Sequence, residues 1–380
     1  MRIREIVEKR KTVKAVVGSL PYIEIGDIDT NTKDYPLKDK GAVPGSVLAC
    51  KGDILVSTVR PTRGAITIVR DESPAVSSAF AVLKPNEKLC MTRYLFYCLC
   101  GKSFLQYLGA NSKGATYPTC SKDDVLDYEF KVAGLSEQAE IVKRLDTVSG
   151  IITKYQQELA ALDDLIKARF VEMFGNPKTN PNNYKTVPFE YVVEYMGDIG
   201  SNGANKVVVD HLDMKDEEDY ALMVRFLNFT KNDFSDDVKY ISKEAYEFFK
   251  KSQLFGGELI ICKIGSAGLN YVMPYLNRPV SLGLNQIMVR ITDEVMMPYL
   301  YQYLHTDYGE QLISGCINGA VTKSITKTEL KKIPVVLPPK EEQNEFSIFV
   351  EQVDKSKVEV QKALENTQLL FDSLMQKYFG

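Results

Sequence analysis

Two short loops in the first third of the chain carry side chains suited to contact a polyanion. The segment 58–64, TVRPTRG, presents Arg60 and Arg63, and a guanidinium group is the side chain best shaped to bind guanine edges or phosphate. The segment 109–118, GANSKGATYP, adds hydroxyl, ammonium and phenol groups at Ser112, Lys113, Thr116 and Tyr117. Such donors could contact base edges or phosphates, and an ordinary solvated turn is the alternative interpretation of both loops.

The second half of the chain carries a matching pair of polar loops. One follows Cys262 and contains Lys263, Ser266 and Asn270. The other spans 316–323 and contains Asn318, Thr322 and Lys323. Since these loops are polar but lack arginine, we expect them to recognise a different sequence from the first pair if both pairs contact nucleic acid.

Signals for catalysis, metal binding and cofactor binding are weak. The two histidines, His211 and His305, are far apart in unlike contexts, which argues against a histidine triad or a multi-histidine metal site. No glycine-rich dinucleotide or phosphate-binding motif follows a strand. The seven cysteines form no CxxC pair and are expected to be buried free thiols. The sequence therefore predicts no catalytic residue, no metal ligand and no cofactor in this chain.

Composition indicates a soluble protein of several domains. The chain has 380 residues, of which 44% are hydrophobic and 26% charged, and no stretch is apolar enough to span a bilayer or to serve as a signal peptide. A cytoplasmic location without membrane contact is expected. The net charge of −3 argues against a uniformly basic nucleic-acid binder. Residues 1–134 are nevertheless basic, with 20 Lys and Arg against 15 Asp and Glu, which is compatible with local contact to DNA.

Residues 1–134 are predicted to mix strands and helices. The β-rich runs 53–59, 65–69 and 79–83 are separated by Gly, Pro, Asn and Asp, and the segment 91–108 has the apolar spacing of one helix.

The second half of the chain repeats the first at a constant offset of 205 positions. Gly52-Asp-Ile-Leu-Val returns as Gly257-Glu-Leu-Ile-Ile, and Glu137-Gln138 returns as Glu342-Gln343. Phe174-Gly175 returns as Phe379-Gly380. Because chance does not keep one register over so long a stretch, the chain contains an internal duplication.

Each repeat ends in a long amphipathic helix with apolar residues three and four positions apart, the pattern of a coiled coil. The first seam consists of Leu145, Val148, Ile152, Tyr155, Leu159, Leu162 and Ile166. The second seam consists of Val350, Val353, Val360, Leu364 and Phe371, with Lys357 and Thr367 interrupting it. Since each helix needs a partner, we expect the two helices of one chain to pair.

The duplication predicts an α+β (mixed α/β) fold with two similar globular domains and two long antiparallel coiled-coil helices between them, related by a pseudo-two-fold repeat. The expected boundaries are 1–134 for the first domain, 135–175 for the first helix, 176–338 for the second domain and 339–380 for the second helix.

These motifs resemble the specificity subunit of Type I restriction–modification systems over essentially the whole chain. The resemblance rests on GDILVSTVR at 52–60, GATYP at 114–118 and MFGNP at 173–177, together with LSEQAEI at 135–141 and PPKEEQNEF at 338–346. Each motif is weak alone, but together they occur in order and most of them twice. The first copy departs from the pattern at Ala133-Gly134, where the second copy has Pro-Pro.

The resemblance implies two target-recognition domains, each reading half of a bipartite, asymmetric site in double-stranded DNA. It implies that the helices set the spacing and bind two modification (methyltransferase) subunits, and that restriction (translocase and nuclease) subunits join the complex. S-adenosylmethionine, ATP and Mg²⁺ would then belong to those partners, and this chain would be non-catalytic. The alternatives are a coiled-coil adaptor between proteins without a DNA role and a self-sufficient DNA methyltransferase or nuclease.

Overall fold

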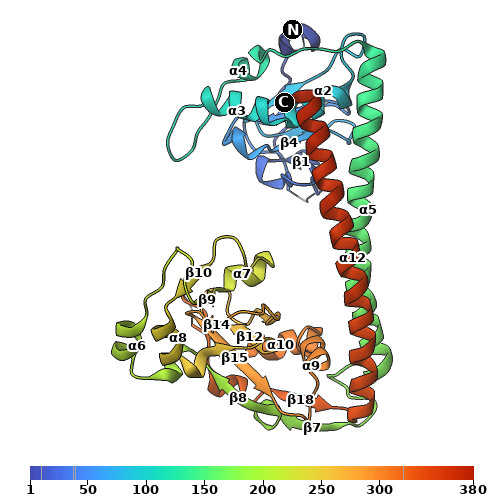
Figure 1. Cartoon of the computed structure of the whole chain (residues 1–380). Helices are drawn as coiled ribbons and strands as arrows, with labels where there is room; N and C mark the ends of the chain where they lie inside the picture. Colours follow the sequence, from blue (N-terminus) through green and yellow to red (C-terminus); the bar gives the residue numbers. More distant parts are fainter. Residues whose placement is uncertain (10, 37, 39, 320) are drawn as a thin grey trace. The chain divides into compact units, whose positions relative to one another are not determined.

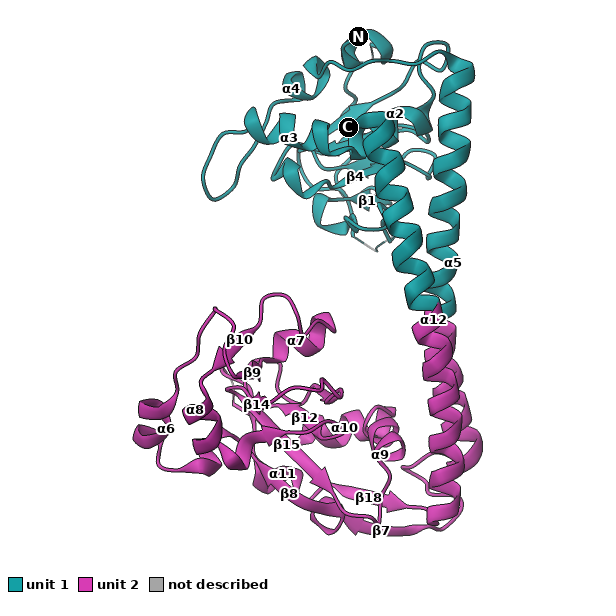
Figure 2. Cartoon of the chain, viewed as in Figure 1, with its two compact units in different colours: residues 1–158, 360–380 teal, residues 159–359 magenta. Residues whose placement is uncertain are grey.

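The computed structural model describes residues 1–9, 11–36, 38, 40–319 and 321–380, and it divides into two compact units (Figures 1 and 2). Unit 1 consists of Met1–Glu158 and Val360–Gly380, and unit 2 consists of Leu159–Glu359. The division passes through both long helices. Each unit therefore combines one α/β domain with part of the helix that follows it and part of the other helix.

The described residues of unit 1 form two small three-stranded sheets and four short α-helices. One sheet has the antiparallel order β4-β3-β6, and the other has the order β1-β5-β2 with β1 and β5 parallel. The strands are β1 (Tyr22–Ile23), β2 (Val47–Leu48), β3 (Ile54–Ser57), β4 (Ile66–Ile68), β5 (Ala75–Val76) and β6 (Phe80–Leu83). The helices are α1 (Ile3–Ile6), α2 (Thr92–Cys100), α3 (Lys102–Ala110) and α4 (Lys122–Asp127), with short 3-10 turns η1 (Ile25–Asp27) and η2 (Pro61–Arg63).

Strand β3 is the centre of unit 1 because both of its faces are buried. Ile54 and Val56 point into a core shared with the helices, whereas Leu55 points into the core between the two sheets. Side chains alternate across a strand, so a strand covered on both faces needs an unbroken apolar run rather than an alternating one. The run Ile-Leu-Val of the sequence meets that need.

Unit 2 is built in the same way and is larger. Its main sheets have the orders β13-β12-β15-β8 and β10-β9-β14-β11, and two strand pairs, β16-β17 and β18-β7, lie beside them. The strands are β7 (Lys185–Pro188), β8 (Val193–Gly197), β9 (Ala221–Val224), β10 (Lys239–Ile241), β11 (Gln253–Leu254), β12 (Leu259–Cys262), β13 (Asn270–Val272), β14 (Val280–Leu282), β15 (Gln286–Ile291), β16 (Ile317–Asn318), β17 (Ser324–Ile325) and β18 (Pro334–Leu337). The helices are α6 (Asn205–His211), α7 (Phe226–Lys231), α8 (Lys243–Phe248), α9 (Met297–Leu304), α10 (Asp307–Gly315) and α11 (Lys327–Leu330), with 3-10 turns η3 (Phe189–Val192), η4 (Ile199–Asn202) and η5 (Lys250–Ser252).

The central strand of unit 2 repeats the burial of β3 residue by residue. In β12, Leu259 and Ile261 join the core that contains α9, and Ile260 joins the core of the other sheet. These positions lie 205 after Ile54, Val56 and Leu55. The duplication seen in the sequence is therefore a duplication of structure, and the predicted fold class is confirmed.

The segment 91–108 forms two helices, so the prediction of one continuous helix there was wrong. Gly101 separates α2 from α3 with extended backbone angles of φ −67° and ψ 149°. A Cβ atom at Gly101 would lie 3.3 Å from the Cβ atom of Phe379. The glycine thus gives room for the end of the last helix, which the apolar spacing of 91–108 could not indicate.

The long helices are α5 (Leu135–Phe174) and α12 (Lys340–Phe379), each of 40 residues. They run in opposite directions in both units: the start of α5 and the end of α12 share the core of unit 1, and the end of α5 and the start of α12 share the core of unit 2. Every predicted seam residue is buried or half-buried. Lys357, which interrupts the second seam, forms an ion pair with Asp163, and its Nζ lies 2.7 Å from a carboxylate oxygen of that residue. No helix in the described ranges is long and apolar enough to cross a membrane.

A buried glutamine joins the start of each long helix to its domain. Gln138 Oε1 accepts a hydrogen bond from the Met91 backbone N–H at 2.8 Å, and its Nε2 donates to the Ala133 carbonyl at 2.8 Å. Gln343 makes the matching bonds with Met296 N–H at 2.9 Å and the Pro338 carbonyl at 2.9 Å. All three positions of the second set lie 205 after those of the first. The glutamine of the Glu-Gln pair therefore attaches the start of each long helix to the domain that precedes it.

Candidate nucleic-acid interface

The two candidate loops of unit 1 lie side by side. The Val59 and Thr119 backbones form a β-bridge, and the Arg60 N–H donates to the Pro118 carbonyl at 2.7 Å. Lys113 and Thr119 exchange backbone hydrogen bonds of 2.8 and 2.9 Å, which turns the second loop into a hairpin. The backbone therefore brings residues that are 58 and 60 positions apart in the sequence to one surface.

Arg60 is held in a defined pose within this surface. Its backbone is left-handed, with φ 47°, an uncommon conformation for a residue with a side chain. Its guanidinium carbon lies 4.1 Å from the centroid of the Tyr117 ring, and Nη2 donates to the Thr116 carbonyl at 3.3 Å. The cation–π contact limits the motion of the arginine and leaves it partly exposed beside an exposed tyrosine.

The other unit 1 candidates lie on the same two loops as Arg60 and Tyr117. Arg63 closes the turn η2 and is exposed, as are Lys113 and Thr116. Ser112 is half-buried, and its hydroxyl donates to the Leu108 carbonyl at 2.7 Å, so it caps α3. Lys33, which the sequence did not single out, reaches the same loop by donating from Nζ to the Gly64 carbonyl at 2.8 Å.

The loops of unit 2 are joined by the same type of contact. The Ile264 and Ser324 backbones form a β-bridge, 205 positions after Val59 and Thr119. The Ile325 N–H also donates to the Lys263 carbonyl at 3.0 Å. Four predicted contact residues are exposed on these loops, namely Ser266, Asn318, Thr322 and Lys323. Ala320, within the second loop, lies outside the described residues.

Two predicted residues of unit 2 lie in less accessible places. Asn270 begins β13 and is 6% exposed, with its amide donating to the Gly268 carbonyl at 3.2 Å. It therefore supports the loop from inside and does not face solvent. Lys263 is half-buried, and its Nζ lies 2.7 Å from a carboxylate oxygen of Asp198.

Comparison with known protein families shows to which family this chain with its repeated pair of loops belongs. The family model described as the Type I restriction modification DNA specificity domain matches residues 1–162 and 193–369. The chain belongs to this specificity family. A curated relative, the Type I restriction enzyme HindI specificity subunit of Haemophilus influenzae, is 27% identical over 149 residues, which cover 38% of this chain and 31% of that relative. The match thus spans about a third of the relative's length.

Solved structures show the same specificity-subunit fold at low sequence identity. The S subunit of a Type I restriction–modification system from M. genitalium matches with a TM-score of 0.56 at 14% identity, covering 100% of this chain and 95% of that one. A chain from a study of complex assembly and conformational transition of the Type I R-M system matches with a TM-score of 0.53 at 19% identity, covering 100% and 96%.

The histidines of this specificity-family chain make contacts within the fold, and its cysteines are not paired in disulfides. His305 Nδ1 lies 2.8 Å from the Tyr301 carbonyl, and His211 stacks on Phe248 with ring centroids 3.9 Å apart. Among the described residues, no group of three or more His, Cys, Asp or Glu side chains is placed to hold a metal ion. All seven cysteines are free, but Cys50 is exposed and Cys100 and Cys120 are only half-buried, so the prediction that all are buried was wrong.

Sequence reasoning missed two residues that shape the second surface, Asp198 and Lys327. Asp198 precedes the segment 257–380 that repeats 52–175. The repeat therefore gave no matching residue that would have singled it out. Lys327 was visible only as the repeat of Lys122. A buried acid beside two lysines from distant segments carries no local sequence signal.

Proposed function

We propose that this chain is the sequence-specific DNA-recognition subunit of a Type I restriction–modification complex. Each unit would recognise one half of a bipartite, asymmetric site in double-stranded DNA. The observation that supports this most directly is the repeated pairing of two polar loops, at Val59–Thr119 in unit 1 and Ile264–Ser324 in unit 2, within a chain of the specificity family.

The two surfaces differ in the chemistry they offer. Unit 1 presents arginine stacked on tyrosine, whereas unit 2 presents amide, hydroxyl and lysine groups. Arginine favours guanine edges, and amides favour adenine edges, so two unlike half-sites are expected. An asymmetric site follows from one fold carrying two different sets of side chains.

The long helices are proposed to set the unread spacer and to bind two modification subunits. Beyond the buried seam, both helices carry apolar side chains that are 38–69% exposed. They are Leu135, Ile151, Leu165, Val171, Ile348, Val358, Leu369 and Leu370. Since exposed apolar surface on a helix favours contact with another protein, these residues mark the faces that the partners would cover.

In this proposal the chain catalyses nothing itself and works in the cytoplasm. The modification subunits would bring S-adenosylmethionine and methylate adenine, and restriction subunits would bring ATP and Mg²⁺ for translocation and cleavage. With a net charge of −3, the chain would rely on these partners for part of the electrostatic attraction to DNA.

The proposal is tested by mapping methylated adenines in DNA from cells that express the chain with its modification subunits. A bipartite motif that disappears when the chain is deleted is the expected result. Methylation by the purified chain alone, with added S-adenosylmethionine, would show instead that it is an enzyme. Binding to modification subunits without any enriched DNA motif would favour a protein adaptor.

A further inference from the structure

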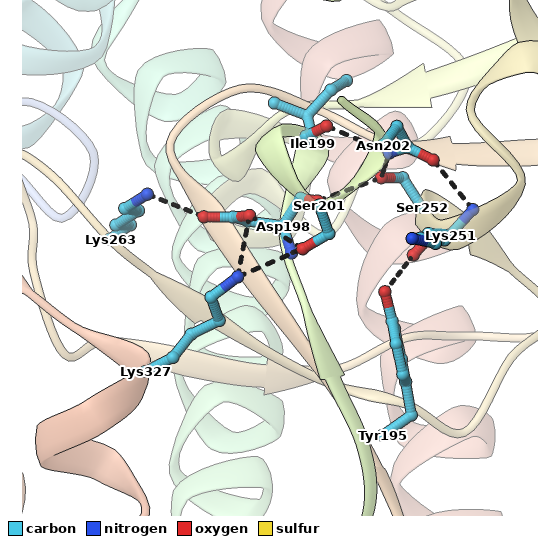
Figure 3. A network of polar contacts seen from close by, with 9 residues as sticks. All are labelled: Tyr195, Asp198, Ile199, Ser201, Asn202, Lys251, Ser252, Lys263 and Lys327. Atoms are coloured by element: carbon cyan, nitrogen blue, oxygen red, sulfur yellow. Dashed lines mark hydrogen bonds and ion pairs between the residues drawn. The ribbon is translucent and has the colours of Figure 1, made fainter. Parts of the chain in front are cut away.

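A single buried carboxylate in unit 2 holds two lysines that come from different segments of the chain (Figure 3). Asp198, directly after β8, is 6% exposed. Its Oδ2 accepts a hydrogen bond from Lys263 Nζ at 2.7 Å, and its Oδ1 accepts one from Lys327 Nζ at 3.1 Å. Lys263 follows β12 at the root of one candidate loop, and Lys327 begins α11 just beyond the other. The cluster of two ammonium groups and one carboxylate carries a net charge of +1.

The carboxylate is fixed before any ligand arrives. Ser201 Oγ donates to Asp198 Oδ1 at 3.1 Å, and Ser252 Oγ donates to the Asp198 backbone carbonyl at 3.3 Å. Burial alone would raise the pKa of Asp198, but the hydrogen bonds and charges of Lys263 and Lys327 more than offset it and lower that pKa. Asp198 therefore stays ionised and keeps both lysines in place at neutral pH.

The two ammonium groups retain the capacity to bind an anion. Each lysine side chain is 36% exposed, and an ammonium group has three donors. Within the described chain, Lys263 Nζ donates to the Asp198 carboxylate, and Lys327 Nζ donates to Asp198 and to Ser201 Oγ. Donors remain on both ammonium groups, and the Lys263 carbonyl accepts a hydrogen bond from the Ile325 N–H, at the base of the loop that carries Lys323.

We propose that Asp198 is a positioning residue that presents Lys263 and Lys327 as a paired-ammonium site for one phosphate of the DNA backbone. This inference rests on the proposed function, since the phosphate belongs to the half-site that unit 2 would recognise. A charge-assisted contact from two fixed lysines sets the register of the domain on the duplex, so that the loop side chains meet the correct bases.

Among the described residues, the matching positions of unit 1 do not form an equivalent cluster. The position 205 before Lys263 is Thr58, whose hydroxyl donates to the Ala79 carbonyl at 2.7 Å and is buried. The counterpart of Lys327 is Lys122, which is exposed. The effect of changing the cluster is therefore confined to the half-site of unit 2.

The test measures DNA affinity of the full chain assembled with its modification subunits, over a series of salt concentrations. The triple variant Asp198→Asn, Lys263→Gln, Lys327→Gln removes both ammonium groups without leaving a buried charge. We expect it to lower the magnitude of the slope of log K against log salt by about 0.9, the value for one phosphate, on specific and unrelated DNA alike. The control is Asp219→Asn with Lys215→Gln, which removes an ion pair of 2.5 Å elsewhere in unit 2 without changing the net charge and should leave the slope unchanged.

The single variant Asp198→Asn tests the positioning role separately. Because it frees two lysines and adds one positive charge, binding to unrelated DNA should tighten, while discrimination at the unit 2 half-site falls at least several-fold and the unit 1 half-site keeps its preference. An unchanged salt slope in the triple variant, or unchanged discrimination in Asp198→Asn, would overturn the inference while leaving the proposed function intact. If the unmodified complex shows no sequence preference at all, the proposed function fails and this inference fails with it.

Discussion

The ring of Phe379, at the end of α12, packs edge-on against the ring of Tyr94 in α2, with centroids 5.3 Å apart and an interplanar angle of 62°. Phe174, at the end of α5, meets Tyr299 of α9 in the same way, at 4.9 Å and 78°. Each long helix thus begins on the domain that precedes it and ends in the core of the other unit's domain. The ends of the two repeated helices are thus exchanged: each completes the core of the unit that contains the other repeat's domain.

Replacing Phe379 by Ala should destabilise unit 1 without affecting unit 2. Phe379 is 9% exposed, and truncating a buried phenylalanine costs about 3–5 kcal/mol through lost burial and the cavity left behind. Hydrogen exchange followed by peptide, under native conditions, should show faster exchange in 1–134. Phe174→Ala should shift the effect to unit 2, and Leu369→Ala, at a position 68% exposed, is the control. Equal loosening of both units by Phe379→Ala would contradict the assignment of this contact to unit 1.

Replacing Gln138 by Leu should detach the start of α5 from its domain. Gln138 is fully buried, and leucine would leave the Met91 N–H and the Ala133 carbonyl without their partner, at about 1–3 kcal/mol for each unsatisfied group. Urea unfolding should show a lower midpoint for unit 1. The exposed Gln156 of α5 offers Gln156→Leu as a control with the same change of side chain. A midpoint as high as that of the control would show that the buried bonds add nothing.

Replacing Arg60 by Lys should weaken base discrimination in one half-site only. Lysine keeps the charge but cannot make the bidentate contact of a guanidinium group, which is worth about 1–3 kcal/mol of discrimination. Binding assays on duplexes altered in one half-site at a time measure the effect. Lys88→Ala, an exposed lysine elsewhere in unit 1, is the control for general charge. Equal losses at both half-sites would point to unspecific electrostatic attraction instead.

The Lys357–Asp163 ion pair should make the helix pair of unit 2 sensitive to alkaline pH. Burial would lower the pKa of Lys357, but its hydrogen bond and charge interaction with Asp163 raise that pKa above the usual value of 10.5. A raised pKa in the folded state means that the stabilisation is complete below pH 10.5 and is lost as the pH rises through the folded-state pKa. Thermal unfolding between pH 8 and pH 11.5 should show this loss, and Lys357→Met should abolish it. A variant with the same alkaline loss would assign it to another group.

Sequence alone predicts the repeated architecture because its signals are local and periodic. The seam from Leu145 to Ile166 and the repeat of Gln138 at Gln343 follow from spacing. In the structure the seam residues are buried or half-buried, and both glutamines are buried. Spacing also could not show that Gly101 lies against Phe379, because the two residues are 278 positions apart.

The candidate interface was predictable only in part. The loops at Arg60 and Lys263 were found by residue type, and the structure joins each with its second loop through backbone bridges. Burial of Asn270 depends on what packs over β13, and the role of Asp198 depends on two lysines brought close by tertiary structure. Neither property can be predicted from the residues next to it in the sequence.

Unit 1 is built from two separate segments of the chain, which affects the order in which the two units can finish folding. Residues 360–380 leave the ribosome only after all of unit 2 has been synthesised, whereas unit 2 is one continuous segment. Since domains tend to fold as they emerge, the second domain can finish folding before the first one has received Phe379. The half of the molecule that is made first is therefore the half that is completed last, and Tyr94 lacks its contact with Phe379 until the end of α12 has been synthesised.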